Sequence, residues 1–159
     1  MKTLKFKKAH PAVILPTYAD PGANGMDVRA FPGVEDTYFI SEPGQNASWS
    51  IPPGTRMIIP TGLFPVIPEG HCLMVLPRSG LAAKQGVTVL NAPGLIDSSY
   101  NGEIKIILIN HGDKEVRIQT GDRIAQLVLV KAPQTVIEET DTLPDTQRGA
   151  GGFGSTGIK

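Results

Sequence analysis

Short apolar runs, separated by turn signals, follow one another along most of the chain. They are rich in valine, isoleucine and leucine, and each is too short for a typical helix. The runs that predict strands are residues 12–16, 26–31, 37–41, 55–60, 63–67, 71–77, 86–91, 103–110, 115–119 and 123–130. Proline and glycine signals recur about every 8–12 residues between them, a spacing typical of an all-β sandwich or barrel.

Two of these runs differ in the faces that they are expected to bury. Residues 103–110 alternate polar and apolar side chains at first, which indicates a strand with one buried face. Residues 123–130 are apolar almost throughout, which predicts a strand that is buried on both faces. In a small domain, a strand of that kind suggests a subunit interface.

One helix and a glycine-rich end complete the pattern. Residues 79–85 are mainly good helix formers, and Ser79 stands at the position of an N-cap. The polar residues 139–147 include a proline and predict an exposed connector. This connector leads to residues 148–159, whose glycines are typical of a flexible tail. We therefore expect a β domain over residues 1–138, followed by the connector and the tail.

Length and charge narrow the class of protein. A chain of 159 residues suits one domain and can bury roughly two-thirds of its unfolded surface. It carries 15 basic and 15 acidic residues, so its formal net charge is zero. That balance argues against a broad footprint for DNA or RNA, although a local pocket for an anion remains compatible with it.

Cysteine and histidine usage excludes several kinds of site. Cys72 is the one cysteine, so an internal disulfide and a cysteine-rich zinc site are ruled out, and its apolar neighbours predict a buried, inert thiol. His10, His71 and His111 lack the spacing of metal ligands. No apolar stretch reaches the roughly 20 residues that cross a bilayer, and the first residues do not resemble a signal peptide. We expect a soluble, intracellular protein.

Arg78 and Ser79 stand directly before the predicted helix and directly after a predicted buried strand. Backbone N–H groups at the start of a helix favour anions, and a guanidinium can bind two phosphate oxygens at once. The alternative is an ordinary serine cap beside a solvated arginine. No lysine follows a glycine run at the spacing of a Walker loop.

Asp97 is a candidate general base. It follows the apolar pair Leu95–Ile96 and precedes a turn, where a carboxylate can orient and deprotonate a water, a contribution of about 10²–10⁴ in rate. Asn91 and the backbone of the hairpin are able to read the polar edge of a small planar ligand. The alternative is that Asp97 starts an Asx-type turn and that Tyr100 packs at a strand edge.

Two further polar residues stand inside apolar segments. Gln126 lies in the run 123–130, where a buried amide without partners costs about 1–3 kcal/mol. It therefore makes either a structural hydrogen bond or a ligand contact. Asp27 opens a strand after a glycine-containing turn, where it either caps that turn or reaches a metal ion through water.

Together these stretches resemble the motifs of the trimeric dUTPase family (deoxyuridine 5′-triphosphate nucleotidohydrolases). Five family motifs occur in order and at compatible spacing, between about residues 12 and 157. They are residues 23–28 (ANGMDV), 77–82 (PRSGLA), 94–103 (GLIDSSYNGE), 121–128 (GDRIAQLV) and 148–157 (RGAGGFGSTG).

The resemblance implies a jelly-roll-like β domain that forms a homotrimer, with each active site built from three subunits. It implies hydrolysis of dUTP to dUMP and pyrophosphate, with Mg²⁺ held on the triphosphate. This activity limits uracil in DNA and supplies dUMP for thymidylate synthesis. The expected location is the cytoplasm, or the host cytoplasm if the source is viral, with no nucleic-acid or membrane partner.

The resemblance also assigns roles around the nucleoside. It makes Asp97 the base that activates the water attacking the α-phosphorus. Tyr100 packs under the deoxyribose and excludes a 2′-hydroxyl group. The uracil edge is read by Asn91 and by the backbone around Leu95 and Ile96, and Lys105 lies near the same hairpin.

A second set of roles concerns the triphosphate and its metal ion. The resemblance assigns phosphate binding to Arg78, Ser79, Gly80 and Gln126, and it lets Asp27 reach Mg²⁺ through water. The glycine-rich tail becomes a lid that serves a neighbouring subunit. Its contacts are Arg148, Gly154 and Ser155 on the β- and γ-phosphates, and Phe153 stacked on the uracil.

Two alternatives stay open. A dCTP deaminase shares the fold but needs a glutamate as proton shuttle and a different pattern after Arg78 and Ser79, whereas Gly80, Tyr100 and the tail favour dUTP hydrolysis. A non-catalytic binding or regulatory protein on the same scaffold would signal through residues 33–50, which are longer than in compact members of the family. Within that stretch, Trp49 is expected to be a packing anchor.

Overall fold

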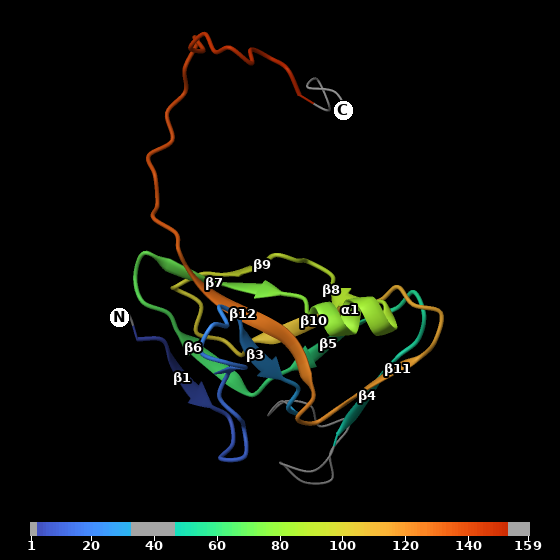
Figure 1. The fold of residues 1–159 in the computed structure, drawn as a ribbon. Helices are drawn as coiled ribbons and strands as arrows, with labels where there is room; N and C mark the ends of the chain where they lie inside the picture. The colour runs from blue at the N-terminus through green and yellow to red at the C-terminus, as the bar shows by residue number, and fades with distance from the viewer. Residues whose placement is uncertain (1–2, 33–46, 153–159) are drawn as a thin grey trace.

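The computed structural model describes residues 3–32 and 47–152. Within them the chain forms twelve strands and one short helix (Figure 1). The strands are β1 (Lys5–Lys8), β2 (Thr17–Tyr18), β3 (Met26–Arg29), β4 (Ser48–Ile51), β5 (Arg56–Pro60), β6 (Leu63–Val66), β7 (His71–Leu76), β8 (Val87–Val89), β9 (Gly94–Ile96), β10 (Lys105–Asn110), β11 (Val116–Gln119) and β12 (Arg123–Lys131). The helix is α1 (Ser79–Gln85). The predicted all-β class with one short helix is confirmed.

Four sheets share one body. The largest has five strands in the order β2-β3-β12-β7-β9, and a second has the order β5-β10-β8. Two-stranded pairs, β1 with β6 and β4 with β11, complete the set. Neighbouring strands run antiparallel in every one of these pairs. β12 lies in the middle of the five-stranded sheet, which brings β3 and β7 to either side of it.

The core is built from the inward faces of these sheets. Ile106 and Leu108 of β10 are buried and alternate with the half-buried Ile107 and Ile109, so one face of this strand is buried as predicted. Burying each such side chain fully contributes about 1.5–3 kcal/mol. Their large, fully buried companions include Ile51, Ile59, Leu63, Leu73, Ile104, Ile124 and Leu127.

The prediction for residues 123–130 is confirmed at one end of β12. Ile124, Ala125 and Leu127 are buried, so both faces are covered there, whereas Val128 and Val130 are half-buried. The less buried end is also the end at which β12, among the described strands, pairs with β7 alone, because its pairing with β3 stops at Leu127.

The strand predictions differ from the structure at residues 12–16 and at β1, β2, β4 and β9, which lie outside every predicted run. Residues 12–16 form no strand; Val13 is buried, while Ile14 and Leu15 are 52% and 48% exposed. This segment is therefore irregular, and a single side chain, that of Val13, inserts into the core. Strand β1 was not expected, because three of its four residues are lysines. They obscure the alternation by which Phe6 is more buried than Lys5 and Lys7. Residues 37–41 lie outside the described part of the chain.

Helix α1 begins one residue earlier than the expected serine cap requires. Arg78 is the N-cap in extended conformation and makes no side-chain cap bond, and Ser79 is the first helical residue, so the prediction of a Ser79 N-cap is wrong. The C-terminus ends on Gly86 at φ 69°, a left-handed conformation that suits glycine.

A tight contact fixes the C-terminal end of α1. A Cβ on Gly112 would lie 2.5 Å from the carbonyl oxygen of Gln85, so this turn after β10 packs directly on the helix. The fully buried Asn110 braces the turn: its Nδ2 donates to the carbonyls of Ile51 and Lys114, and its Oδ1 accepts from Gly112 N. The C-terminal end of α1 is therefore held against the core.

The chain leaves the body after β12 as an extended arm (Figure 1). Residues 132–150 are exposed and contain no strand, and Val136, Ile137 and Leu143 are 85%, 93% and 87% exposed. The boundaries of the β domain at residue 138 and of the connector at residue 147 stay predictions. In the described residues, no helix has the length and apolar character to cross a membrane.

The expected burial of Cys72 and Trp49 is confirmed. Cys72 is a free thiol, 5% exposed, on β7. Trp49 is 5% exposed on β4 and belongs to the core. Each therefore packs rather than presents its side chain to a ligand.

Candidate active site

A pocket of about 220 Å³ lies between β9 and β10. Apart from Phe153, which lies outside the described residues, it gathers the residues that the sequence assigned to the nucleoside and to the catalytic base. These are Asn91, Leu95, Ile96, Asp97, Tyr100 and Lys105, and Glu103 joins them. Residues that are up to 14 positions apart in the sequence thus line one concave site (Asn91 to Lys105).

One wall of this pocket depends on the pairing of β9 with β7. Gly94 pairs with Val75, and a Cβ on Gly94 would lie 3.2 Å from both the Val75 side chain and the Asn91 amide nitrogen. Glycine therefore allows β9 to lie flat against β7 with the Asn91 amide beside it. Leu95, 64% exposed, presents its backbone at the rim.

Asp97 stands at the end of β9 and keeps its carboxylate available. Its backbone carbonyl accepts a hydrogen bond from Tyr100 N at 3.1 Å, which closes the turn. The turn is therefore not an Asx turn, because its acceptor is the main chain. Asp97 is exposed, and the described residues offer its carboxylate no hydrogen bond.

Tyr100 folds back over the turn to form the opposite wall. Its hydroxyl donates to the carbonyl oxygen of Glu103 at 2.7 Å. A Cβ on Gly102 would lie 2.6 Å from that hydroxyl oxygen, so only glycine leaves room for the ring. The ring is 45% exposed and lines the pocket, which leaves one face open to a ligand.

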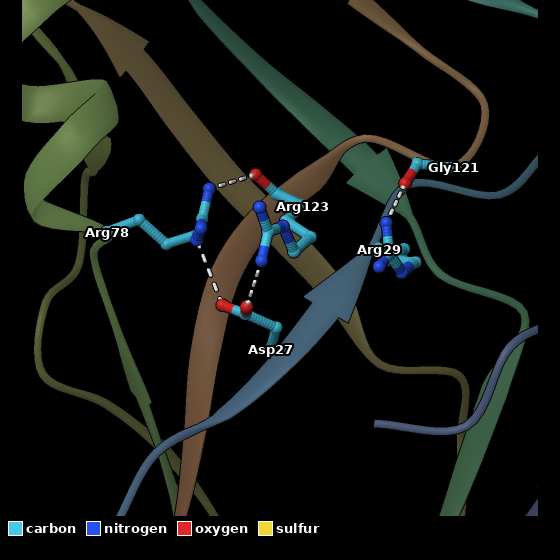
Figure 2. A network of polar contacts seen from close by, with 5 residues as sticks. All are labelled: Asp27, Arg29, Arg78, Gly121 and Arg123. Atoms are coloured by element: carbon cyan, nitrogen blue, oxygen red, sulfur yellow. Dashed lines mark hydrogen bonds and ion pairs between the residues drawn. The ribbon is translucent and has the colours of Figure 1, made fainter. Parts of the chain in front are cut away.

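A second polar cluster lies at the start of α1 (Figure 2). Asp27, 5% exposed on β3, accepts hydrogen bonds from Arg78 Nε at 2.9 Å and from Arg123 Nη1 at 3.1 Å. The two bonds use different oxygens of the carboxylate. Arg78 Nη1 also donates to the carbonyl of Arg123 at 3.3 Å. One buried carboxylate thus orients two guanidinium groups.

Strand register explains why Gln126 belongs to the same cluster. Gln126 of β12 pairs with Asp27 of β3 on one side and with Leu76 of β7 on the other. Directly opposite residues project from the same face of a sheet. Gln126 is half-buried, and its side chain would contact a Cβ on Gly25 at 3.2 Å.

The charges of the cluster favour an anion. Two guanidinium groups and one carboxylate leave one net positive charge, and Arg78 and Arg123 remain 24% and 45% exposed. Ser79 and Gly80 are exposed next to them, and nothing lies within 4 Å of where a Gly80 side chain would start. A phosphate is the kind of group that such a site binds.

Magnesium fits this cluster poorly. Both oxygens of Asp27 already accept bonds from cations, which would repel a divalent ion. Among the described residues, no three His, Cys, Asp or Glu side chains come together to hold a metal ion. The role of Asp27 as a water-mediated ligand stays a prediction, and the two arginines weigh against it.

Asp97 and the arginine cluster lie near opposite ends of β7. Asp97 follows Ile96, which pairs with Leu73, and it borders a further hollow together with Cys72. Arg78 follows Leu76 at the other end. From Cys72 to Leu76 the strand spans about 13 Å at the usual rise of about 3.3 Å per residue. One chain alone therefore does not place Asp97 beside the arginines.

The predicted residues of the tail are separate from both groups. Arg148 lies on the exposed arm, where its Nε donates to the carbonyl of Gly151 at 2.8 Å. Phe153, Gly154 and Ser155 lie outside the described residues. Their assigned contacts stay predictions.

Comparison with known proteins decides the family. The dUTPase family profile matches residues 45–157, which is more than half of the chain. The chain belongs to the dUTPase family. As a dUTPase, it carries four of the five predicted motifs wholly inside its described residues, and the fifth extends beyond them.

Curated relatives of this dUTPase chain cover nearly all of it. The deoxyuridine 5′-triphosphate nucleotidohydrolase of Syntrophotalea carbinolica is 44% identical over 98% of this chain and 97% of that protein. Those of Rhizobium rhizogenes and Caulobacter vibrioides are 46% and 48% identical over 91% of this chain, and over 85% and 86% of their own lengths.

Solved structures share the fold at low sequence identity. A mutant dUTPase of Staphylococcus bacteriophage 80alpha, solved with dUpNHpp, has a TM-score of 0.82, with 22% identity over 99% of this chain and 100% of that one. The dUTPase of phage phi11 of S. aureus has a TM-score of 0.73, with 19% identity over 91% of this chain and 100% of that one. The jelly-roll-like fold is thereby confirmed.

Two residues of the site were missed from the sequence. Arg123 stands in the fourth motif, but its pairing with Asp27 spans 96 positions and depends on the register of β12 with β3. Glu103 ends the third motif and lines the pocket. Their charge was the signal that could have found them. Each stands beside a buried strand segment, where an unpaired charge raises the free energy of the folded state.

Proposed function

We propose that this dUTPase-family chain hydrolyses dUTP to dUMP and pyrophosphate. The observation that carries the proposal is the pocket that gathers Asn91, Asp97, Tyr100 and Lys105 around one cavity of about 220 Å³. The Asn91 amide suits a uracil, and the available Asp97 carboxylate suits an attacking water. The Tyr100 ring suits a deoxyribose, and the Lys105 ammonium suits a phosphate.

The nucleoside binds in the pocket with its base toward β9. Asn91 and the backbone of Leu95 and Ile96 read the polar edge of the uracil. Tyr100 lies against the deoxyribose, and its fixed ring leaves no space for a 2′-hydroxyl. The bond from its hydroxyl to Glu103 supports this role because it holds the ring in one position.

The chemical step is an attack of water on the α-phosphorus. Asp97 accepts a proton from the water, whose oxygen forms a bond to the α-phosphorus. The bond from that phosphorus to the bridging oxygen breaks, and pyrophosphate leaves with the electron pair. The exposed carboxylate of Asp97 supports this role, because it is not used by the turn that carries it.

The triphosphate binds at the arginine cluster. Arg78, Ser79, Gly80 and Gln126 contact its oxygens, and Arg123 adds a second guanidinium. Catalysis then comes mainly from positioning and electrostatic stabilisation, without a covalent nucleophile. Magnesium, carried by the triphosphate rather than by a protein cage, supplies further neutralisation of charge. A phage phi11 dUTPase mutant is known to coordinate a structural Mg(II) ion.

A complete site needs more than one copy of the chain. The separation of Asp97 from Arg78 within one chain supports a homotrimer in which neighbours contribute the pocket and the cluster. The exposed apolar arm supports a third contribution, in which Arg148, Phe153, Gly154 and Ser155 close over a neighbour's ligand. Cytoplasmic location, limitation of uracil in DNA and supply of dUMP belong to the same proposal.

Release of pyrophosphate from dUTP, dCTP, dTTP and UTP, measured with Mg²⁺ present, tests this function. The expected result is turnover of dUTP with strong preference over the other three. Deamination of dCTP would instead support a deaminase. Binding without turnover of any nucleotide would support a regulatory protein on this scaffold.

A further inference from the structure

Glu103 ties the nucleoside pocket to the core of the protein. Its side chain is 10% exposed, although it is charged and lines the pocket. Its Oε1 accepts a hydrogen bond from Gly62 N at 2.8 Å, a contact between positions 41 apart in the sequence. A nearly buried carboxylate that accepts a backbone N–H has a defined position, because breaking that bond leaves the N–H without its acceptor.

The donor side of this link, at Gly62, is rigid. Gly62 has φ +66° in the turn between β5 and β6, and its carbonyl accepts a bond from Ala9 N at 2.8 Å. A Cβ on Gly62 would lie 2.6 Å from the Val13 side chain, so this turn packs tightly against the segment after β1. Glu103 is therefore fastened to a part of the chain that has little freedom to move.

The link extends to Tyr100 through the peptide unit that follows Glu103. The carbonyl of this unit accepts the bond from the Tyr100 hydroxyl, and its N–H, on Ile104, donates to Leu63 O at 2.8 Å. The Glu103 side chain thus adds a second attachment to the same turn, next to the one at Leu63. Two attachments fix the tilt of a peptide unit, whereas one allows it to rock.

The other carboxylate oxygen faces Lys105. Its Oε2 lies 3.9 Å from Lys105 Nζ, whose side chain is 41% exposed and also lines the pocket. An ion pair of that exposure and length contributes little to stability. Its effect is to bias the direction of the ammonium group.

We propose that Glu103 is a positioning residue that sets the discrimination of this pocket against a ribose 2′-hydroxyl. It acts through Tyr100, by holding the carbonyl that receives the tyrosine hydroxyl, and it directs Lys105 secondarily. The proposal rests on the proposed function, because it names the substrate feature that the dUTPase pocket rejects. Glu103 itself makes no contact with the reacting atoms.

Two substitutions separate the hydrogen bond from the charge. Glu103→Gln keeps an oxygen that accepts from Gly62 N and removes the charge near Lys105. Glu103→Ala removes both. Glu115→Ala, at an exposed position in the turn before β11, serves as the matched control. The measurements are kcat and KM for dUTP and for UTP, together with the midpoint of thermal unfolding.

The expected result is a fall of about tenfold in the ratio of kcat/KM for dUTP to kcat/KM for UTP in Glu103→Ala. Glu103→Gln should keep this ratio within about twofold of the wild type, because the hydrogen bond survives, and should raise KM for both nucleotides by a few-fold. Glu115→Ala should leave both constants unchanged.

Other outcomes overturn the proposal. An unchanged ratio in Glu103→Ala excludes a role in discrimination. Equal losses for dUTP and UTP, with a lowered unfolding midpoint and no recovery in Glu103→Gln, reduce Glu103 to a general structural residue. A wild-type chain that hydrolyses neither nucleotide contradicts the proposed function instead, so the two failures are distinguishable.

Discussion

Asp27 and Arg78 form an ion pair at 2.9 Å although 51 positions separate them, and Arg123 pairs with the other oxygen of the same carboxylate at 3.1 Å. The carboxylate is 5% exposed, whereas the guanidinium groups reach toward solvent. Asp27 thus acts from inside the sheet to hold two cations at a spacing that suits a polyanion. Its main effect is on geometry, since it cancels only one of the two positive charges.

Asp27→Asn is expected to weaken binding of the triphosphate and to leave binding of the nucleoside intact. An amide removes the charge that holds both guanidinium groups, so Arg78 and Arg123 repel each other and spread apart. We expect the free energy of unfolding to fall by about 1–3 kcal/mol and KM for dUTP to rise about tenfold. Chemical denaturation and steady-state kinetics check these values, and calorimetry with deoxyuridine checks the nucleoside.

Asp20→Asn is the matched control for this substitution. Asp20 is exposed, and its Oδ1 accepts a bond from Gly22 N, which an asparagine oxygen also accepts. It should change the free energy of unfolding by no more than about 0.5 kcal/mol. Equal effects of the two substitutions, or an unchanged KM in Asp27→Asn, would show that the arginines do not depend on Asp27.

Asp97→Asn is expected to retain binding of a non-hydrolysable dUTP analogue and to lose most turnover. The amide keeps the shape of the side chain but accepts no proton from water, so kcat should fall by about 10²–10⁴. Single-turnover kinetics and calorimetry separate these effects. Asp113→Asn, in an exposed turn, should hydrolyse dUTP like the wild type, and near-normal turnover in Asp97→Asn would refute the assignment of the base.

The sequence was most informative where chemistry depends on neighbours in the chain. Asn91, Asp97, Tyr100 and Lys105 lie within 15 consecutive residues, from just before β9 to the start of β10, so a motif read from the sequence also placed them in one pocket. The half-buried strand at residues 103–110 was predictable for a similar reason, since alternation along β10 directly reflects its buried face.

Features that depend on distant pairings were not predictable in the same way. Arg123 joins Asp27 only because β12 pairs with β3, and Glu103 bonds to Gly62, 41 positions away, in the turn between β5 and β6. Local signals also failed where packing decides: residues 12–16 have the composition of a strand, but only Val13 finds a place in the core. Ser79 is not the N-cap, because the helix already begins at Ser79 and the extended residue before it is Arg78.

A chain that ends at Gln147 is expected to fold and to assemble normally but to hydrolyse dUTP poorly. The described residues after Gln147 add no strand and contribute nothing to the core, so thermal unfolding and sedimentation should be unchanged. Without Arg148 and the glycine-rich lid, kcat/KM should fall by about 10²-fold, because fewer groups enclose the phosphates. A chain that ends at Gly157 keeps the whole fifth motif and should remain fully active. If the shorter chain fails to fold, the tail is structural.

The proposed division of the site between subunits predicts that two inactive variants complement each other. Arg78→Ala damages the cluster and Asp97→Asn removes the base, so each variant alone should be nearly inactive. When the two variants are refolded together in equal amounts, a site takes Arg78 from one subunit and Asp97 from a neighbour. Each of these subunits carries the intact residue in about half of cases, so about a quarter of the sites are intact. Activity near a quarter of the wild type is therefore expected from the mixture. Sites contained within single chains would gain nothing from mixing, and a monomer by sedimentation that hydrolyses dUTP would contradict the shared site directly.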